Sequence, residues 1–235
     1  MMLNSLKEDL TKFANREKAK LLAGFFKTGK GQYAEGDIFL GITVPLQRSI
    51  AKKYKELKLA EISVLLKSKI HEERLVGLLI LVEQFKEADE KLKSKIFNFY
   101  LDNIVGVNNW DLVDLSAPNI VGIYLINNRR HLPLLNKLVR SNNIWKRRIA
   151  VLATCPFIKQ KKFDPTIKIS EILLSDKHDL IHKAVGWMLR EVGKADEKAL
   201  DDFLIKHHKI MPKTMLRYAI EKMDEEKRKR YLKGF

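Results

Sequence analysis

Apolar residues recur at helical spacing along almost the whole chain. Residues 178–193 show this most clearly, because their apolar positions follow a period of about 3.6 residues and leave a polar side opposite. Alternating strand-like patterns are almost absent, and the chain holds only 11 glycines and 6 prolines. We therefore predict an all-α protein. The expected apolar face of residues 178–193 comprises Ile181, Ala184, Val185, Met188, Leu189 and Val192.

The same pattern predicts helices over most of the sequence. The apolar run Leu75–Val82 indicates a buried core helix, and Thr28–Gly41 is the one long irregular stretch, either a functional loop or a connector. The expected helices cover residues 4–14, 16–27, 44–55, 59–68, 71–86, 89–103, 110–126, 131–140, 143–159, 165–174, 178–193, 196–207, 212–222 and 224–232.

Four of the longer predicted helices share a repeating set of positions. Spacings of 37, 36 and 36 residues separate Arg74, Asp111, Arg147 and Lys183. Two positions after these residues stand Val76, Val113, Ile149 and Val185, and one further stand Gly77, Asp114, Ala150 and Gly186. This period is typical of HEAT or armadillo repeats. We expect a single domain over residues 1–235, a curved α-solenoid of tandem HEAT-like helical repeats with a basic concave face.

Two prolines interrupt these long helices. Pro118 falls within residues 110–126, and Pro156 falls within residues 143–159. Because proline lacks a backbone N–H, each should kink its helix. We expect both helices to bend around the concave face.

Composition narrows the functional classes. A formal net charge of +16 favours a polyanionic partner, with nucleic acid ahead of a merely solubilising surface. No apolar run is long enough to span a membrane. The single cysteine, Cys155, excludes an intrachain disulfide and fits a reducing cytoplasm. His178 and His182 have a metal-like spacing but lack a recognisable third ligand, so we predict no metal site.

Asp114 is a carboxylate on an expected apolar face, and it is the first candidate for chemistry. Its helical neighbours include Trp110, Ala117 and Val121, so an unpaired charge there is costly. One repeat later Arg148 stands in a similar apolar setting. The two charges either form a buried salt bridge that specifies packing or belong to a functional site.

A second tryptophan favours the site. Trp187 lies on the basic side of its helix one turn before Arg190, although packing under the next helix would also explain it. Corresponding stretches of three consecutive repeats would bring Trp110, Asp114, Arg148, Trp187 and Arg190 to one patch. The predicted DNA contacts are Arg148, Arg190, Lys183, Arg147 and Lys194.

Two indoles, a carboxylate and arginines fit cleavage of an N-glycosidic bond. The carboxylate would stabilise an oxocarbenium-like transition state and orient the attacking water. A base that alkylation has made cationic leaves without a general acid. The indole faces would favour a cationic lesion or the charged sugar.

Four motifs resemble those of the AlkD-type DNA glycosylases, the HEAT-like DNA alkylation repair enzymes. They are Trp110-Asp-Leu-Val-Asp114, Asn143-Ile-Trp-Lys-Arg-Arg148-Ile-Ala, Lys183-Ala-Val-Gly-Trp187-Met-Leu-Arg190-Glu and Phe39-Leu-Gly-Ile-Thr-Val-Pro45-Leu-Gln-Arg48. They follow the family's order and span nearly the whole chain. The resemblance implies excision of N3- and N7-alkylated purines such as 3-methyladenine and 7-methylguanine from duplex DNA, without a metal or organic cofactor and without base flipping into a deep pocket.

The resemblance also assigns roles by motif. Asp114 would be the catalytic carboxylate, Trp110 and Trp187 would line the lesion, and Arg148 and Arg190 would bind the backbone near it. Some family members have a tyrosine near the lesion where this chain has Phe25 and Phe26, and that departure bears on lesion range and rate.

The leading hypothesis is a monomeric DNA glycosylase of the cytoplasm, associated with the nucleoid when bound to DNA. One alternative is a non-catalytic HEAT-repeat protein that binds DNA or RNA, for which a carboxylate facing phosphates would be a disadvantage. The other alternative is a protein-interaction scaffold, which the charge of +16 argues against.

Overall fold

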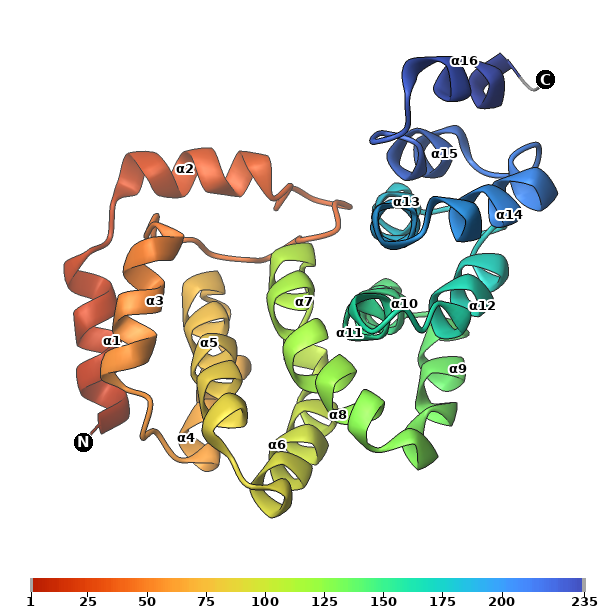
Figure 1. Ribbon diagram of the computed structural model, residues 1–235. Helices are drawn as coiled ribbons and strands as arrows, with labels where there is room; N and C mark the ends of the chain where they lie inside the picture. Colours follow the sequence, from red (N-terminus) through yellow and green to blue (C-terminus); the bar gives the residue numbers. More distant parts are fainter. Residues whose placement is uncertain (1, 234–235) are drawn as a thin grey trace. The chain divides into compact units, whose positions relative to one another are not determined.

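The computed structural model describes residues 2–233, and within that range the protein is all-α, as predicted (Figure 1). An isolated parallel bridge between Ile38 and Ile70 is the one pairing of β type among these residues. The α-helices are α1 (Met2–Lys12), α2 (Arg16–Phe25), α3 (Val44–Lys53), α4 (Leu59–Leu66), α5 (His71–Glu87), α6 (Glu90–Asp102), α7 (Trp110–Ser116), α8 (Ile123–Asn127), α9 (Pro133–Val139), α10 (Ile144–Leu152), α11 (Cys155–Lys159), α12 (Asp164–Ile172), α13 (Asp179–Ala195), α14 (Glu197–His207), α15 (Lys213–Ala219) and α16 (Glu225–Lys233). Short turns of other helical types are η1 (Ile104–Gly106), η2 (Pro118–Gly122) and η3 (Arg129–His131).

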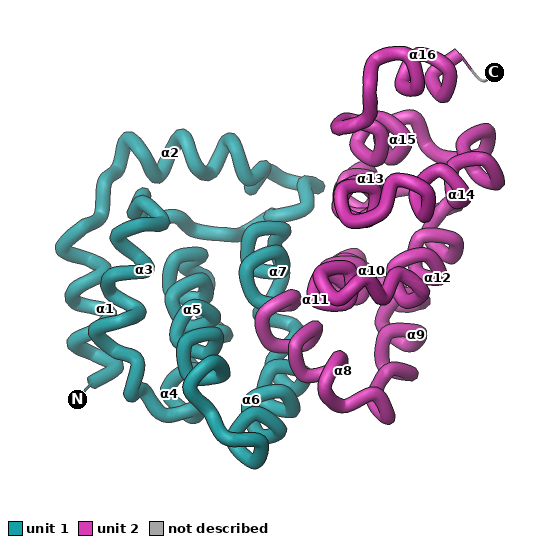
Figure 2. Tube along the Cα trace, viewed as in Figure 1, with its two compact units in different colours: residues 1–116 teal, residues 117–235 magenta. Residues whose placement is uncertain are grey.

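The chain forms two compact units, residues 1–116 and residues 117–235 (Figure 2). Each unit has its own apolar core, and each is described below by itself. The expectation of one domain over residues 1–235 stays a prediction. Among residues 2–233, no helix combines the length and the apolar character that a membrane span requires.

Helix α5 is the centre of the first unit and packs against α3, α4 and α7 (Figure 1). The predicted core run Leu75–Val82 is buried throughout. Burial extends to the polar first turn of α5, where His71, Glu72, Glu73 and Arg74 are all buried. Buried charges need partners inside the protein, and these partners build the candidate site.

The second unit is arranged in two rows of helices (Figure 1). One row contains α10, α13 and α15, and the other contains α9, α12 and α14. Helix α13 joins the rows because it packs against α10, α12, α14 and α15. Its six predicted apolar positions, Ile181 to Val192, are all fully buried, which confirms the pattern read from the sequence.

The repeat register is confirmed by burial. Val76, Val113, Ile149 and Val185 are each 0% exposed, so the same position of α5, α7, α10 and α13 serves each local core. The next position of the repeat is Gly186 in α13, and packing explains why it is small. An added Cβ there would lie 2.5 Å from the carbonyl oxygen of Met215 in α15. A close approach of two helix backbones therefore excludes a side chain there.

Both prolines interrupt their helices more severely than the predicted kinks. In place of one helix over 110–126, α7 ends at Ser116, and the π-helical turn η2 from Pro118 precedes α8. Pro118 has no N–H for the carbonyl of Asp114, four residues earlier, so the α-helical ladder stops. The predicted helix 143–159 likewise divides into α10 and α11, with Pro156 in the first turn of α11. Ala117 keeps α-helical angles (φ −60°, ψ −45°) and remains a helical neighbour of Asp114, whereas the α-helical spacing no longer applies to Val121, which lies in the π-helical turn.

The irregular stretch before α3 is held in place by a buried carboxylate. Glu72 accepts hydrogen bonds from the backbone N–H groups of Leu40 (3.0 Å), Gly41 (2.8 Å) and Ile42 (3.3 Å). Gly41 has φ +84°, and a Cβ there would lie 2.2 Å from the carbonyl oxygen of Asn15, so only glycine fits. The end of this loop is thus fixed to the first turn of α5 through its backbone.

Candidate functional site

Trp110 lies in a cluster of aromatic rings in the first unit. Its indole stacks on Phe26, with ring centroids 5.1 Å apart and planes 12° from parallel. Phe25 meets the same indole edge-on at 5.9 Å. The two phenylalanines that were expected near the lesion are therefore brought together with Trp110, one of the predicted catalytic residues.

The two phenylalanines have different environments. Phe26 is 7% exposed and stacks on Phe39 at 5.0 Å as well as on Trp110, whereas Phe25 is 64% exposed. Phe25 follows Leu21 by one turn of α2, and Leu21 is also exposed. Phe26 is therefore part of the structural support of Trp110, and Phe25 presents an aromatic surface to solvent.

Asp114 follows Trp110 by one turn of α7 and is partly buried. The neighbouring positions Leu112, Val113 and Ser116 are fully buried, so α7 is firmly packed within the first unit. Ser116 donates to the Leu112 carbonyl and lies 3.0 Å from the hydroxyl of Tyr100 in α6. The carboxylate and the indole are therefore carried by one short, well-anchored helix.

A buried polar network underlies this helix. The His71 imidazole lies with Nε2 2.7 Å from Asp111 Oδ2 and with Nδ1 3.3 Å from Asp37 Oδ2. Arg74 donates to the same Asp37 oxygen at 2.7 Å. Asp37 comes from the loop, His71 and Arg74 from α5, and Asp111 from α7, so the network joins three segments of the first unit.

The electrostatics of the network favour its charged forms. Burial alone would lower the pKa of His71, but hydrogen bonds to Asp111 and Asp37 outweigh it, so the pKa is raised. Burial would raise the pKa of Asp37, but His71 and Arg74 outweigh it and lower the pKa. An imidazolium between two carboxylates satisfies both ring nitrogens as donors.

Arg148 lies in the second unit and is 5% exposed. Its guanidinium donates through Nη1 to the carbonyl oxygen of Leu180, in the first turn of α13. Arg148 therefore ties α10 to α13 inside the unit. Its predicted contact with DNA stays a prediction, and so does the alternative of a purely structural salt bridge with Asp114.

Trp187 and Arg190 lie on the predicted side of α13, and both are partly buried. Arg190 forms an ion pair with Glu221 and lies 3.6 Å from Glu191. Burial would raise the pKa of Glu221, but the charge of Arg190 outweighs it and lowers the pKa. Any phosphate that binds Arg190 must compete with these carboxylates.

Arg147 has the same internal contacts as its repeat counterpart Arg74. Each donates through Nη1, at 2.8 Å, to the carbonyl oxygen of the serine six residues earlier, Ser68 or Ser141. Arg147 also donates through Nε to Asp176 at 2.7 Å. A phosphate contact by Arg147 would have to be made in addition to these bonds, so that contact stays a prediction.

The two predicted lysine contacts are also paired with acids. Lys183 lies 2.7 Å from Asp179, and Lys194 lies 2.9 Å from Glu191, both within one turn of α13. Both lysines are substantially exposed, so their pairs are open to solvent and to ligands. The predicted histidine pair has internal contacts as well, since His178 caps α13 and His182 contacts the Asp176 carbonyl.

Each unit therefore assembles its own share of the predicted residues. Phe25, Phe26, Trp110 and Asp114 belong to the first unit, and Arg147, Arg148, Lys183, Trp187, Arg190 and Lys194 belong to the second. The convergence of the two sets on one patch stays a prediction.

The sequence interpretation missed the support beneath Trp110. His71, Asp37 and Phe39 were not assigned to the site, although Phe39 opens the fourth motif and Asp37 stands just before it. The available signal was the polar run His71–Arg74 directly before the apolar run from Leu75. Charges at the start of a fully buried helix require partners, and a preceding loop is a natural source of them.

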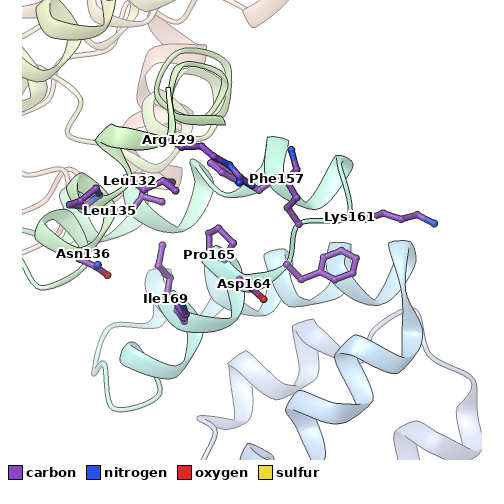
Figure 3. A pocket seen from close by; sticks show the side chains of 13 residues that line it. Arg129, Leu132, Leu135, Asn136, Phe157, Lys161, Asp164, Pro165 and Ile169 are labelled. Carbon is purple, nitrogen blue, oxygen red and sulfur yellow. The ribbon is translucent and has the colours of Figure 1, made fainter. Parts of the chain in front are cut away.

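Both units contain cavities. One of about 230 Å³ in the first unit is lined mainly by apolar side chains, with His71 and Asp111 among its polar residues. Figure 3 shows another, of about 650 Å³, between α9, α11 and α12 of the second unit. Arg129, Lys161, Lys162 and Lys168 contribute cations to it, but none of the predicted site residues lines it.

The fold and these motifs define a helical-repeat protein, and comparisons identify its family. The family model for DNA alkylation repair enzymes matches residues 6–223, so the chain belongs to the DNA alkylation repair enzyme family. This confirms the resemblance seen in the four motifs. No curated protein matches the chain significantly.

Solved structures share the fold at low identity. A predicted DNA alkylation repair enzyme from Enterococcus faecalis is similar with a TM-score of 0.72 and 16% identity, covering 90% of this chain and 97% of that one. AlkD2 from Streptococcus mutans is similar with a TM-score of 0.54 and 17% identity, covering 95% of this chain and 100% of that one.

Proposed function

We propose that the protein is a DNA glycosylase that hydrolyses the N-glycosidic bond of cationic N3- and N7-alkylated purines in duplex DNA. The observation that carries the proposal is the placement of Asp114 one turn after Trp110 on α7, whose indole contacts the rings of Phe25 and Phe26. A carboxylate one helical turn from such an indole suits a site in which positive charge develops. Membership of the DNA alkylation repair enzyme family supports the same assignment.

The reaction would run through charge stabilisation. The bond between the purine nitrogen and C1′ breaks, and the cationic base leaves as a neutral purine with the bonding electron pair. The sugar then carries an oxocarbenium-like charge, which the Asp114 carboxylate stabilises. Water adds its oxygen to C1′, and its proton passes to solvent by way of Asp114. Trp110 would face the lesion, and Phe25 offers a further ring to it.

The second unit would bind the phosphate backbone of the duplex. The proposed phosphate contacts are Arg148, Arg190, Lys183, Arg147 and Lys194, and Trp187 is also proposed to contact the lesion. The excess of cations fits this partner, since the formal net charge is +16. We propose that the protein acts as a monomer in the cytoplasm, without a metal or organic cofactor.

The test is a lesion panel. Duplex DNA treated with a methylating agent would be incubated with the protein, and the released bases would be separated by chromatography and identified by mass. The proposal predicts release of 3-methyladenine or 7-methylguanine. Duplexes carrying uracil or hypoxanthine, which are neutral lesions, should release nothing because their bases are poor leaving groups without an acid. DNA binding without release of any methylated base would instead support a non-catalytic DNA-binding protein.

A further inference from the structure

His71 occupies a central position in the first unit although no motif draws attention to it. It is the first residue of α5 and is 2% exposed. Its ring stacks on Phe39, with centroids 4.6 Å apart, and lies 5.0 Å from Phe26. Phe26 in turn stacks on Trp110. The imidazole therefore supports the ring stack that ends at the indole of the proposed site.

The same imidazole contacts α7 directly. Its Nε2 lies 2.7 Å from Asp111, which stands between Trp110 and the buried Leu112 in the first turn of α7. Asp111 also accepts from the backbone N–H of Leu112 at 2.9 Å, so its carboxylate is fixed to that turn. A residue held at this point controls the entry of the chain into the helix that carries Trp110 and Asp114.

His71 is itself held rigidly from the opposite side. Asp37 lies 3.3 Å from Nδ1, and Arg74 fixes Asp37 at 2.7 Å. The backbone N–H of His71 donates to the Ile38 carbonyl at 2.9 Å. The groups facing the ring are thus Asp37 from the loop, Arg74 from α5, Asp111 from α7 and the rings of Phe26 and Phe39. The carboxylate of Glu72, the next residue, accepts hydrogen bonds from backbone N–H groups of the loop and is not among these groups.

We propose that His71 is a positioning residue for the proposed glycosylase reaction. Through Asp111 and the Phe26 stack, it sets the position of Trp110 and Asp114 relative to the lesion. The predicted effect of His71 on the rate of base release rests on the proposed function. The claim that His71 sets the position of Trp110 does not depend on that function. Small displacements of a reacting group cost rate steeply, whereas binding of the DNA backbone depends on other residues. His71 should therefore affect base release much more than DNA affinity.

The experiment compares His71→Gln with a matched control, His208→Gln. His208 is also buried, and its Nδ1 contacts the Leu204 carbonyl in the second unit. In single-turnover base release from methylated duplex DNA, His71→Gln should be slower by about tenfold or more. The affinity of His71→Gln for undamaged duplex should stay within about twofold of the wild-type value. His208→Gln should release base at the wild-type rate, although its thermal stability should be similar to that of His71→Gln.

A spectroscopic measurement tests the placement of Trp110 without activity. The indole N–H resonance of Trp110, assigned with Trp110→Phe, should move with pH in step with the imidazole resonances of His71. This pH-dependent shift of the Trp110 resonance should vanish in His71→Gln. It should change in Asp111→Asn, which keeps a hydrogen-bond acceptor but removes the charge. Asp111→Asn also serves if His71→Gln fails to fold, because Asp111 is partly exposed, and its base release should be slowed as well.

Three outcomes would overturn the inference. These are unchanged base release in the His71 and Asp111 variants, an equal loss in His208→Gln, or a Trp110 resonance that ignores the titration of His71. If the wild type released no base at all, the proposed function would fail. The resonance measurement would then still decide whether His71 sets the position of Trp110.

Discussion

Phe26 lies face to face with Trp110, with ring centroids 5.1 Å apart and planes 12° from parallel, while its neighbour Phe25 meets the same indole edge-on. One ring of the Phe-Phe pair is thus buried in the support of the indole, and the other is exposed. The two can be separated experimentally, because burial and exposure predict opposite effects on stability and function.

Replacement of each phenylalanine by alanine should therefore give different results. Phe26→Ala should lower the free energy of unfolding by about 3–5 kcal/mol, because it opens a cavity among Phe39, His71 and Trp110. Phe25→Ala should cost less than about 1 kcal/mol, since the ring is mostly exposed. Chemical denaturation measures both values. Equal losses of stability would mean that the ring cluster is not packed as described.

The ion pair between Arg190 and Glu221 makes a prediction about DNA affinity. Because Glu221 competes with phosphate for the guanidinium, Glu221→Gln should raise affinity for duplex DNA by about threefold or more. Arg190→Ala should lower affinity and reduce the slope of log affinity against log salt by about one. Titration by fluorescence anisotropy at several salt concentrations measures both effects.

Glu56→Gln provides the control, because it removes an equal charge from an exposed position of the first unit. If Glu56→Gln and Glu221→Gln raise affinity equally, net charge alone accounts for the effect. An unchanged salt slope in Arg190→Ala would place Arg190 outside the DNA contact.

The His71 network predicts how stability depends on pH. The pKa of His71 is raised above its ordinary value by Asp111 and Asp37, against the effect of burial. A group whose pKa is raised by folding stabilises the protein fully below its unfolded pKa, and the contribution disappears as pH rises through the folded pKa. The stability difference between wild type and His71→Gln should thus be larger at about pH 5.5 than at about pH 9. Urea unfolding at the two pH values tests this, and a difference that grows with pH would refute it.

A side chain at Gly186 should cause a steric clash where α13 contacts α15. An added Cβ would lie 2.5 Å from both the Met215 carbonyl oxygen and the Tyr218 Cβ, so Gly186→Ala should destabilise by about 1–3 kcal/mol. Gly24 in α2 is the matched control, because an added Cβ there meets nothing within 4 Å. Gly24→Ala should be neutral or stabilising, since alanine favours helix over glycine. Thermal unfolding separates the two, and similar melting temperatures would contradict the close helix approach.

Much of the fold follows from local pattern. The predicted helices at 71–86 and 178–193 match α5 and α13 within two residues at each end, because an apolar face must be buried wherever the helix packs. The repeat positions Val76, Val113, Ile149 and Val185 are core residues for the same reason. The four motifs in the sequence indicated the family, and the match of the family model to residues 6–223 confirms it.

The candidate site depends on contacts between residues far apart in the sequence, and the local pattern of apolar and polar residues does not predict such contacts. Asp37 and Asp111 lie 34 and 40 residues from His71, so their pairing arises only when the loop and α7 pack on α5. Arg147 shows a related difficulty. An arginine that binds phosphate and one that ties down a loop, as Arg147 does through Ser141, have the same appearance in sequence. The division at Pro118 was foreseen as a kink, but the π-helical turn depends on packing around it.

The central claim concerns the carboxylate of Asp114, and single-turnover release of methylated purines by the wild type and Asp114→Asn tests it most directly. The account predicts that Asp114→Asn keeps its melting temperature and DNA affinity but loses base release, because the amide cannot stabilise the sugar cation. Glu56→Gln should release base at the wild-type rate. Full release of 3-methyladenine or 7-methylguanine by Asp114→Asn would contradict the account, since the charge proposed to drive the reaction would be dispensable.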